Sequence, residues 1–128
     1  MAARVLSFGS LNIDYVYRVD HIITPGETLD TAGLALHCGG KGLNQSVALP
    51  RAGADVAHAG IVGTDGQMLV DACRDSGVDV SRIKVGEGRS GHTIIQVDAS
   101  GQNCILLFGG TNRQVTADYI DEALAGYG

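Results

Sequence analysis

The most informative stretch of the chain reads Gly39-Gly40-Lys41-Gly42-Leu43-Asn44-Gln45-Ser46, and two further glycines follow at Gly53 and Gly63. Because glycine has no Cβ, a glycine-rich turn can bring its backbone close to a polar ligand. The pattern predicts a helix that starts within this stretch, and a helix N-terminus offers unpaired N–H groups and a partial positive charge. The stretch is therefore a candidate binding site for hydroxyl groups or phosphoryl oxygens.

The composition argues against several classes of function. The 128 residues carry a net charge of −5 and a pI near 5.1, which disfavours nucleic acid because phosphate neutralisation needs a basic face. No apolar run approaches the roughly 20 residues of a membrane-spanning helix. The N-terminal residues lack a signal-peptide pattern, and the three cysteines are far apart. The four histidines show no metal-ligand spacing. We expect a cytoplasmic protein with no metal site and no membrane or nucleic-acid partner.

Strand and helix patterns alternate through the middle of the chain. We predict strands over residues 5–8, 15–19, 29–36, 56–62, 92–97 and 103–108. We predict a helix over residues 42–52 that ends early or kinks at Pro50, and a second over 65–76 with Asp65 as cap and Gly77 as stop. A third helix follows the cap Thr116, with Ile120, Ala123 and Leu124 on one face.

The order of these elements predicts the fold class. Strand and helix alternation over residues 55–85 is typical of parallel strands joined by crossover helices. The strands over 15–19 and 29–36, and those over 92–97 and 103–108, instead form antiparallel hairpins. We therefore expect an α/β fold in which a small antiparallel sheet projects from a parallel-sheet core.

Two polar residues directly follow the first predicted strand. Asn12 and Asp14 stand two residues apart, so in an extended chain their side chains point to the same face. A carboxylate beside a carboxamide suits a pair of sugar hydroxyls. A turn in which each side chain bonds its own backbone explains the same residues equally well.

Other polar residues and motifs leave alternatives open. Lys41 at a helix N-terminus opposes the macrodipole, which indicates either a solvated side chain or an anionic partner. Asn44 caps the helix or binds a ligand, whereas Asn112 fits a turn better than a ligand contact. The G-x-G-x-x-G pattern over Gly86–Gly91 precedes a strand rather than a helix, so it does not predict a dinucleotide site.

Taken together, four motifs in order resemble the ribokinase branch of the PfkB carbohydrate kinases. The motifs are Gly9-Ser10-Leu11-Asn12-Ile13-Asp14, then Thr24-Pro25-Gly26-Glu27-Thr28, then the stretch from Gly39 to Ser46, and Gly109-Gly110-Thr111-Asn112. The resemblance covers essentially the whole chain. It implies a ribokinase-like parallel-sheet core, here partial, with a small β-sheet lid. The implied core segments are residues 1–13, 37–85 and 110–128, and the implied lid segments are 14–36 and 88–109.

The resemblance also implies a function and a set of site residues. It implies an ATP-dependent kinase that phosphorylates a hydroxyl of a sugar or related small molecule, and lid edges that pair two copies into a homodimer. The implied sugar-binding residues are Asn12, Asp14, Gly39, Gly40, Lys41 and Asn44 near the glycine stretch, with Thr93 and Ile95 covering the sugar from the lid. Closure of such a lid would exclude the water that competes as phosphoryl acceptor.

The chain departs from the resemblance in its length, because similar proteins are more than twice as long. Their second signature, which carries the catalytic aspartate and the anion hole, has no match here, nor has the site for ATP and Mg²⁺. We therefore expect a truncated, inactive N-terminal part of a sugar kinase, with no catalytic residue of its own. The alternatives are a non-catalytic sugar-binding or dimerisation module and a fragment of a fructokinase-like or nucleoside kinase.

Overall fold

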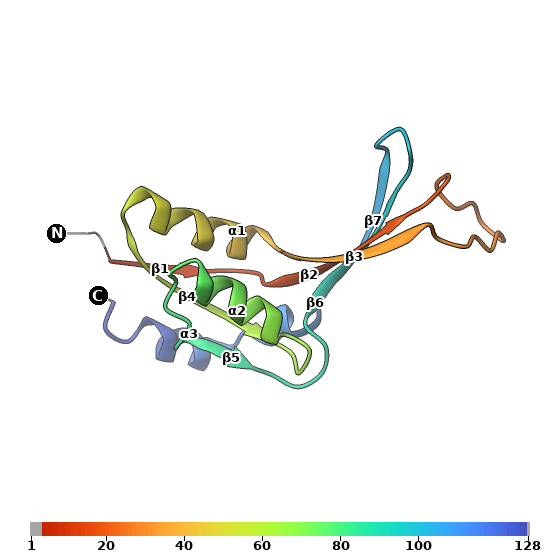
Figure 1. The fold of residues 1–128 in the computed structure, drawn as a ribbon. Helices are drawn as coiled ribbons and strands as arrows, with labels where there is room; N and C mark the ends of the chain where they lie inside the picture. The colour runs from red at the N-terminus through yellow and green to blue at the C-terminus, as the bar shows by residue number, and fades with distance from the viewer. Residues whose placement is uncertain (1–3, 128) are drawn as a thin grey trace.

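The computed structural model describes residues 4–127 (Figure 1). Residues 1–3 and 128, which the implied core segments include, lie outside the described part. The core is a three-stranded parallel sheet with the order β1-β4-β5. Its strands are β1 (Arg4–Phe8), β4 (Asp55–Val62) and β5 (Ile83–Val85). This parallel pairing confirms the expectation from the alternation of strands and helices.

Helices cover both faces of the core sheet. They are α1 (Lys41–Ala48), the 3-10 turn η1 (Leu49–Ala52), α2 (Gln67–Asp75), the 3-10 turn η2 (Gly110–Gln114) and α3 (Ala117–Leu124). Because successive strand residues point to opposite faces, Val56 and Val62 of β4 pack with Leu69 of α2 in one hydrophobic cluster. Ile61 of β4 packs with Tyr119 of α3 in another cluster. The central strand β4 is therefore buried on both sides.

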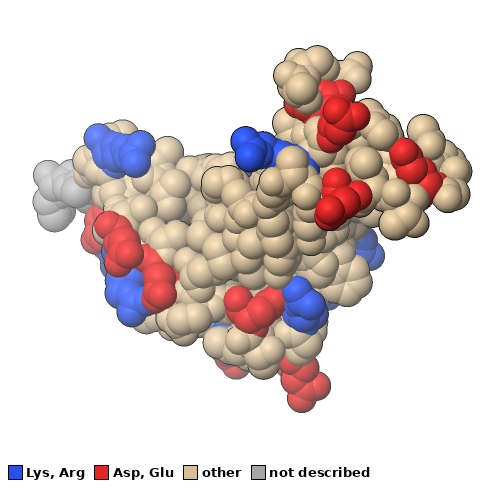
Figure 2. Space-filling view, turned by 45° about the vertical axis from the view of Figure 1, so that its right-hand side comes forward, with Lys and Arg blue, Asp and Glu red and all other residues tan. Residues whose placement is uncertain are grey.

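A second sheet projects away from this core, as Figure 1 shows. We call it the lid sheet, and its four strands lie in the order β3-β2-β6-β7. The strands are β2 (Asn12–Arg18), β3 (Gly33–Gly39), β6 (Gly91–Val97) and β7 (Asn103–Phe108). Figure 2 shows acidic side chains gathered towards the far end of this projection.

The lid sheet is mixed, so the prediction of a purely antiparallel lid was wrong in one respect. The hairpins β2–β3 and β6–β7 are antiparallel as predicted, but β2 and β6 pair with each other in parallel. The reason is that both strands leave the core in the same direction, and β3 and β7 are their return strands. Two hairpins joined through their outgoing strands give one continuous sheet.

Several element boundaries differ from the predictions. β2 starts at Asn12 and β3 ends at Gly39, because the ladder of the hairpin continues down to its base, where these two residues pair. Helix α1 stops at Ala48, and Pro50 lies in η1, which confirms the early end. Gly77 follows the C-cap of α2, and its φ of +88° stops the helix, also as predicted.

Two predictions about helix residues were wrong. Asp65 does not cap α2, whose N-cap is Gly66. The carboxylate of Asp65 instead accepts a hydrogen bond from the backbone N–H of Ser90 at 2.8 Å. Thr116 caps α3 as predicted and Ala123 is buried, but Ile120 and Leu124 are exposed and Tyr119 takes their expected place in the core. Within residues 4–127, no helix is long and apolar enough to cross a membrane.

Candidate functional site

The start of helix α1 lies directly on the end of β1. A Cβ on Gly42 would stand 2.5 Å from the carbonyl carbon of Gly9, so only glycine fits between the two backbones. Gly40 has a φ of +98°, and the backbone N–H of Leu43 donates to the carbonyl of Ser10 at 3.0 Å. The glycine stretch thereby holds the N-terminus of α1 against the segment that leads into β2.

That segment delivers Asn12 and Asp14 to one face of the lid sheet. Asp14 pairs in register with Thr93 of β6, whose hydroxyl donates to its Oδ1 at 2.7 Å. Gly39 faces the other carboxylate oxygen, and a Cβ there would collide with Asp14 Oδ2. The carboxylate is therefore held between a hydroxyl and a bare stretch of backbone, close to the glycine turn.

Asn112 orients Asn12, a role that the sequence analysis missed. Its Nδ2 donates to Oδ1 of Asn12 at 2.6 Å, and its Oδ1 accepts from the backbone N–H of Leu11 at 3.0 Å. Gly91 leaves room for this pair, because a Cβ there would stand 2.5 Å from Asn12 Oδ1. Asn112 is thus more than the turn residue that we predicted. Its membership of the fourth motif was the only sequence signal for this role.

Within the described residues, no hydrogen bond or ion pair joins the remaining predicted site residues to Asp14. Lys41 and Asn44 are exposed on the first turn of α1, and within residues 4–127 neither side chain makes a hydrogen bond or ion pair. Ile95 lies two residues beyond Thr93 on the same face of β6, where it is half-buried. The structure thus brings Asn12, Asp14, Gly39 and Thr93 into contact and places the other residues around them.

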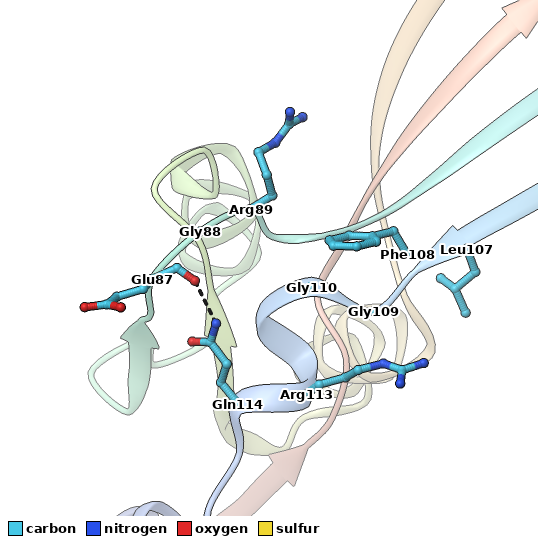
Figure 3. A pocket seen from close by; sticks show the side chains of 9 residues that line it. All are labelled: Glu87, Gly88, Arg89, Leu107, Phe108, Gly109, Gly110, Arg113 and Gln114. Carbon is cyan, nitrogen blue, oxygen red and sulfur yellow. Dashed lines mark hydrogen bonds between the residues drawn. The ribbon is translucent and has the colours of Figure 1, made fainter.

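Two hollows lie near this cluster without including Asp14. A hollow of about 430 Å³ beside η2, shown in Figure 3, shares none of the predicted site residues. Its lining residues are Glu87, Gly88, Arg89, Leu107, Phe108, Gly109, Gly110, Arg113 and Gln114. A second hollow of about 400 Å³ includes Val16 and His37, which share the face of Asp14 on the lid sheet. The direct contacts of Asp14 with Thr93 and Gly39, rather than either hollow, define the candidate site.

A charged contact joins the lid sheet to the core beside the site. The guanidinium of Arg89 donates to Asp65 at 3.0 Å and to the hydroxyl of Tyr15 on β2 at 2.9 Å. Burial raises the pKa of Asp65, but the hydrogen bonds from Ser90 and Arg89 outweigh this and hold it below its ordinary value. In the part of the chain that the structure describes, no group of three His, Cys, Asp or Glu side chains is placed to hold a metal ion.

The comparison with known proteins places the chain in a family. The profile of the pfkB family carbohydrate kinases matches residues 2–125. The chain belongs to this family. It is 36% identical over 128 residues to the ribokinase of Staphylococcus aureus (strain COL), covering 96% of this chain and 42% of that protein.

Two solved structures of ribokinases share the fold. Ribokinase from Cryptococcus neoformans var. grubii serotype A, in complex with ADP, is 38% identical with a TM-score of 0.79, over 86% of this chain and 35% of that one. Ribokinase from Arabidopsis thaliana, complexed with ribose and ATP, is 26% identical with a TM-score of 0.83, over 97% of this chain and 43% of that one. The predicted family and α/β fold class are thereby confirmed. The chain spans less than half the length of these relatives.

Proposed function

We propose that the protein transfers the γ-phosphoryl group of ATP to a hydroxyl of a sugar, and that this chain holds the sugar. One observation carries the proposal: the Asp14 carboxylate is fixed by the Thr93 hydroxyl and lies against the glycine turn at Gly39. A carboxylate is an acceptor only, and sugar hydroxyls are donors that such a group recognises. Charge-assisted hydrogen bonds of this kind are the stronger ones.

The other site residues have complementary roles in this proposal. Asn12, held by Asn112, offers a second polar group on the same face as Asp14. Gly40 lets the sugar approach the backbone, while Lys41 and Asn44 reach it from the first turn of α1. Ile95, with Thr93, covers the sugar from the lid sheet and excludes water.

ATP and Mg²⁺ belong to the longer protein in this proposal, as does the aspartate that takes the proton from the sugar hydroxyl. When bound, Mg²⁺ neutralises charge on the phosphates during transfer. The residues of this chain bind and orient the sugar and keep water away. We further propose that residues 1–13, 37–85 and 110–128 form the core and that residues 14–36 and 88–109 form the lid.

Calorimetric titration of the protein with D-ribose tests the sugar-binding role. We choose ribose because the Arabidopsis relative was solved with it. Asp14→Asn keeps the shape of the side chain but removes its charge, so we expect the Kd for ribose to rise about 30-fold. Asp30→Asn, at an exposed carboxylate of the loop between β2 and β3, is the matched control and should leave the Kd unchanged. Equal ribose affinity of the Asp14 variant and the parent protein would disprove the assigned role.

The same titration separates the alternatives. Tighter binding of fructose or adenosine than of ribose would assign the protein to a fructokinase-like or nucleoside kinase class. ADP formation with ribose, measured on the longest protein that the gene encodes, distinguishes a kinase from a non-catalytic sugar-binding module. Absence of turnover in that protein, despite ribose binding, would favour the module.

We also propose that two copies pair through the lid sheet. The support is its exposed apolar surface, since Leu106 is 72% exposed and Leu107 68% exposed on the edge strand β7. The two leucines point to opposite faces of the sheet, so this edge strand exposes apolar side chains on both faces, and an unpaired edge strand is prone to pair with another chain. Sedimentation of the protein with and without Leu106→Lys checks this: we expect a dimer to become a monomer.

A further inference from the structure

A buried chain of polar contacts lies behind the glycine turn. Ser46 of α1 and His58 of β4 are both fully buried, and Ser46 Oγ lies 2.6 Å from His58 Nδ1. The other ring nitrogen, Nε2, lies 3.1 Å from the carbonyl oxygen of Gly9 at the end of β1. Three elements that are distant in sequence are thus joined through one imidazole ring.

The chemistry of the partners fixes the direction of both hydrogen bonds. A carbonyl oxygen can only accept, so Nε2 of His58 carries the proton and donates to Gly9. In the neutral ring Nδ1 is then an acceptor, and the hydroxyl of Ser46 donates to it. Burial lowers the pKa of His58, and the bond to Gly9 opposes this only in part, which agrees with a neutral ring. Both ring nitrogens are therefore satisfied with a single proton.

The chain of contacts ends where the two halves of the proposed sugar site meet. Gly9 leads within five residues to Asp14, and Ser46 lies one helical turn beyond Gly42. The backbones of Gly9 and Gly42 touch without side chains to interlock them. One backbone hydrogen bond, from Leu43 to Ser10, crosses this junction. The Ser46–His58–Gly9 contacts add directional bonds to it, because a hydrogen bond prefers a narrow range of distances and angles.

We propose that Ser46 and His58 are positioning residues for the sugar site. They fix the first turn of α1 relative to the segment that carries Asn12 and Asp14. Neither residue touches the sugar, and both act through the contact between Gly9 and Gly42. The inference rests on the proposed function, because it assigns the two residues to the geometry of that same site.

Amide hydrogen exchange tests the positioning without any sugar. The N–H of Leu43 donates to Ser10 across the junction, so its protection reports directly on how α1 sits against that segment. Ser46→Ala removes one hydrogen bond and leaves a buried acceptor, so we expect exchange at Leu43 to accelerate about tenfold. The N–H of Gly86, which bonds to Val62 in the core, should keep its rate. Equal acceleration at both amides, or none at Leu43, would overturn the proposal.

A matched control distinguishes this effect from the loss of any serine hydroxyl. Ser76 at the end of α2 bonds the carbonyl of Ala72 at 2.9 Å, far along the chain from the junction. Ser76→Ala should leave exchange at Leu43 unchanged. A response at Leu43 equal to that of the Ser46 variant would contradict the positioning role.

Ribose titration of a double variant separates positioning from stability. Replacing both partners by apolar residues, as Ser46→Ala with His58→Phe, removes the unsatisfied ring nitrogen but leaves the Gly9 carbonyl without its donor, so it should recover part of the lost stability. We nevertheless expect about fivefold weaker ribose binding, because the two directional bonds made by the His58 ring are gone. Affinity equal to that of the parent protein would show a merely structural role. If the parent protein itself does not bind ribose, the proposed function fails, while the exchange measurement still decides the positioning.

Discussion

The central strand β4 of the core sheet and the edge strand β7 of the lid sheet are both apolar, yet the side chains of β4 are buried and those of β7 are exposed. Every residue of β4 after Asp55 is buried between helices, whereas every residue of β7 is exposed. Leu69 in the core is completely buried, and Leu106 in the lid is 72% exposed. The core strand β4 is therefore stabilised by hydrophobic burial, while the edge strand β7 depends mainly on its ladder of backbone hydrogen bonds.

The proposed site lies at the boundary between these two regions. Asp14 and Thr93 belong to the first residues of two lid strands, while Gly40 belongs to the turn that begins the core helix α1. The geometry of the site therefore depends on how the core and the lid sheet are oriented relative to each other. At this junction Gly40 and Gly42 have no room for a Cβ, which lets the two backbones lie directly against each other.

Leucine truncation should give the largest difference between the two regions. Leu69→Ala leaves a cavity in the buried cluster of α2 and should lower the free energy of unfolding by about 4 kcal/mol. Leu106→Ala removes a side chain that is already exposed, so it should change that free energy by less than about 0.5 kcal/mol. Urea denaturation followed by circular dichroism measures both values at low protein concentration. Similar losses for the two variants would show that the lid sheet is buried against something in solution.

Glycine substitution gives the next largest contrast. Gly42→Ala forces a Cβ into the backbone of Gly9 and should cost about 2 to 3 kcal/mol in the free energy of unfolding. Gly33→Ala in β3 is the matched control, because its Cβ would meet only the Arg18 side chain at an ordinary 3.5 Å. The control should be neutral or stabilising, since alanine restricts the unfolded chain. If Gly33→Ala destabilised the protein as much as Gly42→Ala, the close packing of Gly42 against Gly9 would not explain the loss.

The sequence predicts the core well because its signals are local. Alternation of strand and helix, Pro50 near the end of α1 and Gly77 after α2 each act within a few residues, and all three predictions are confirmed. The parallel pairing of β2 with β6 joins residues about 79 positions apart, for example Asp14 with Thr93. No local pattern in either strand specifies its partner, so the mixed lid sheet was missed.

In the site, too, local features can be predicted from the sequence and long-range contacts cannot. Asn12 and Asp14 are predictable as a pair, because alternation in a strand places them on one face. The position of Asn112 depends on a contact across 100 residues, and Asp65 bonds Ser90 rather than capping its own helix. The buried Ser46–His58 pair is likewise invisible in sequence, since each residue alone is ordinary at a surface. Long-range hydrogen bonds between short polar side chains are thus the main part that sequence patterns do not reveal.

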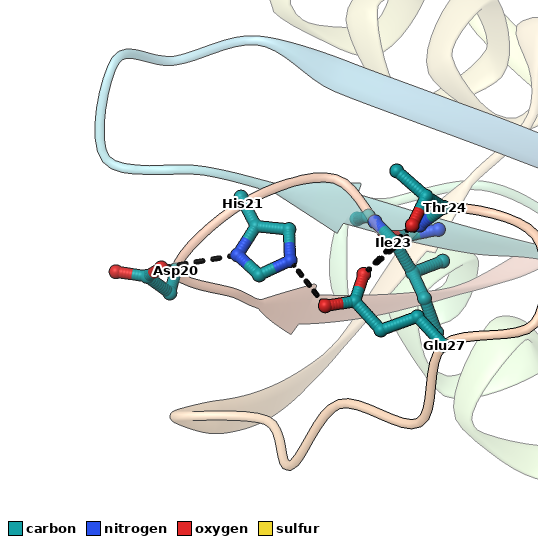
Figure 4. A network of polar contacts seen from close by, with 6 residues as sticks. Asp20, His21, Ile23, Thr24 and Glu27 are labelled. Carbon is teal, nitrogen blue, oxygen red and sulfur yellow. Dashed lines mark hydrogen bonds and ion pairs between the residues drawn. The ribbon is translucent and has the colours of Figure 1, made fainter.

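Histidine titration should give the smallest effect and reports on one residue in each region. At the far end of the lid, His21 lies between the carboxylates of Asp20 and Glu27 (Figure 4), at 3.1 and 2.7 Å. Hydrogen bonds to Asp20 and Glu27 raise the pKa of His21 above its ordinary 6.5, whereas burial lowers that of His58 in the core. NMR titration of the histidine ring protons should therefore find the two midpoints on opposite sides of 6.5.

The two shifts have opposite consequences for stability. The contribution of His21 is complete below its unfolded pKa and is lost as the pH rises through its raised folded pKa. The contribution of His58 is complete above its unfolded pKa and is lost as the pH falls through its lowered folded pKa. Glu27→Gln should move only the midpoint of His21 downwards, because Glu27 is remote from the core histidine. A shift of both midpoints in that variant would mean that the lid tip and the core titrate as one unit, and the separation of the two regions would be refuted.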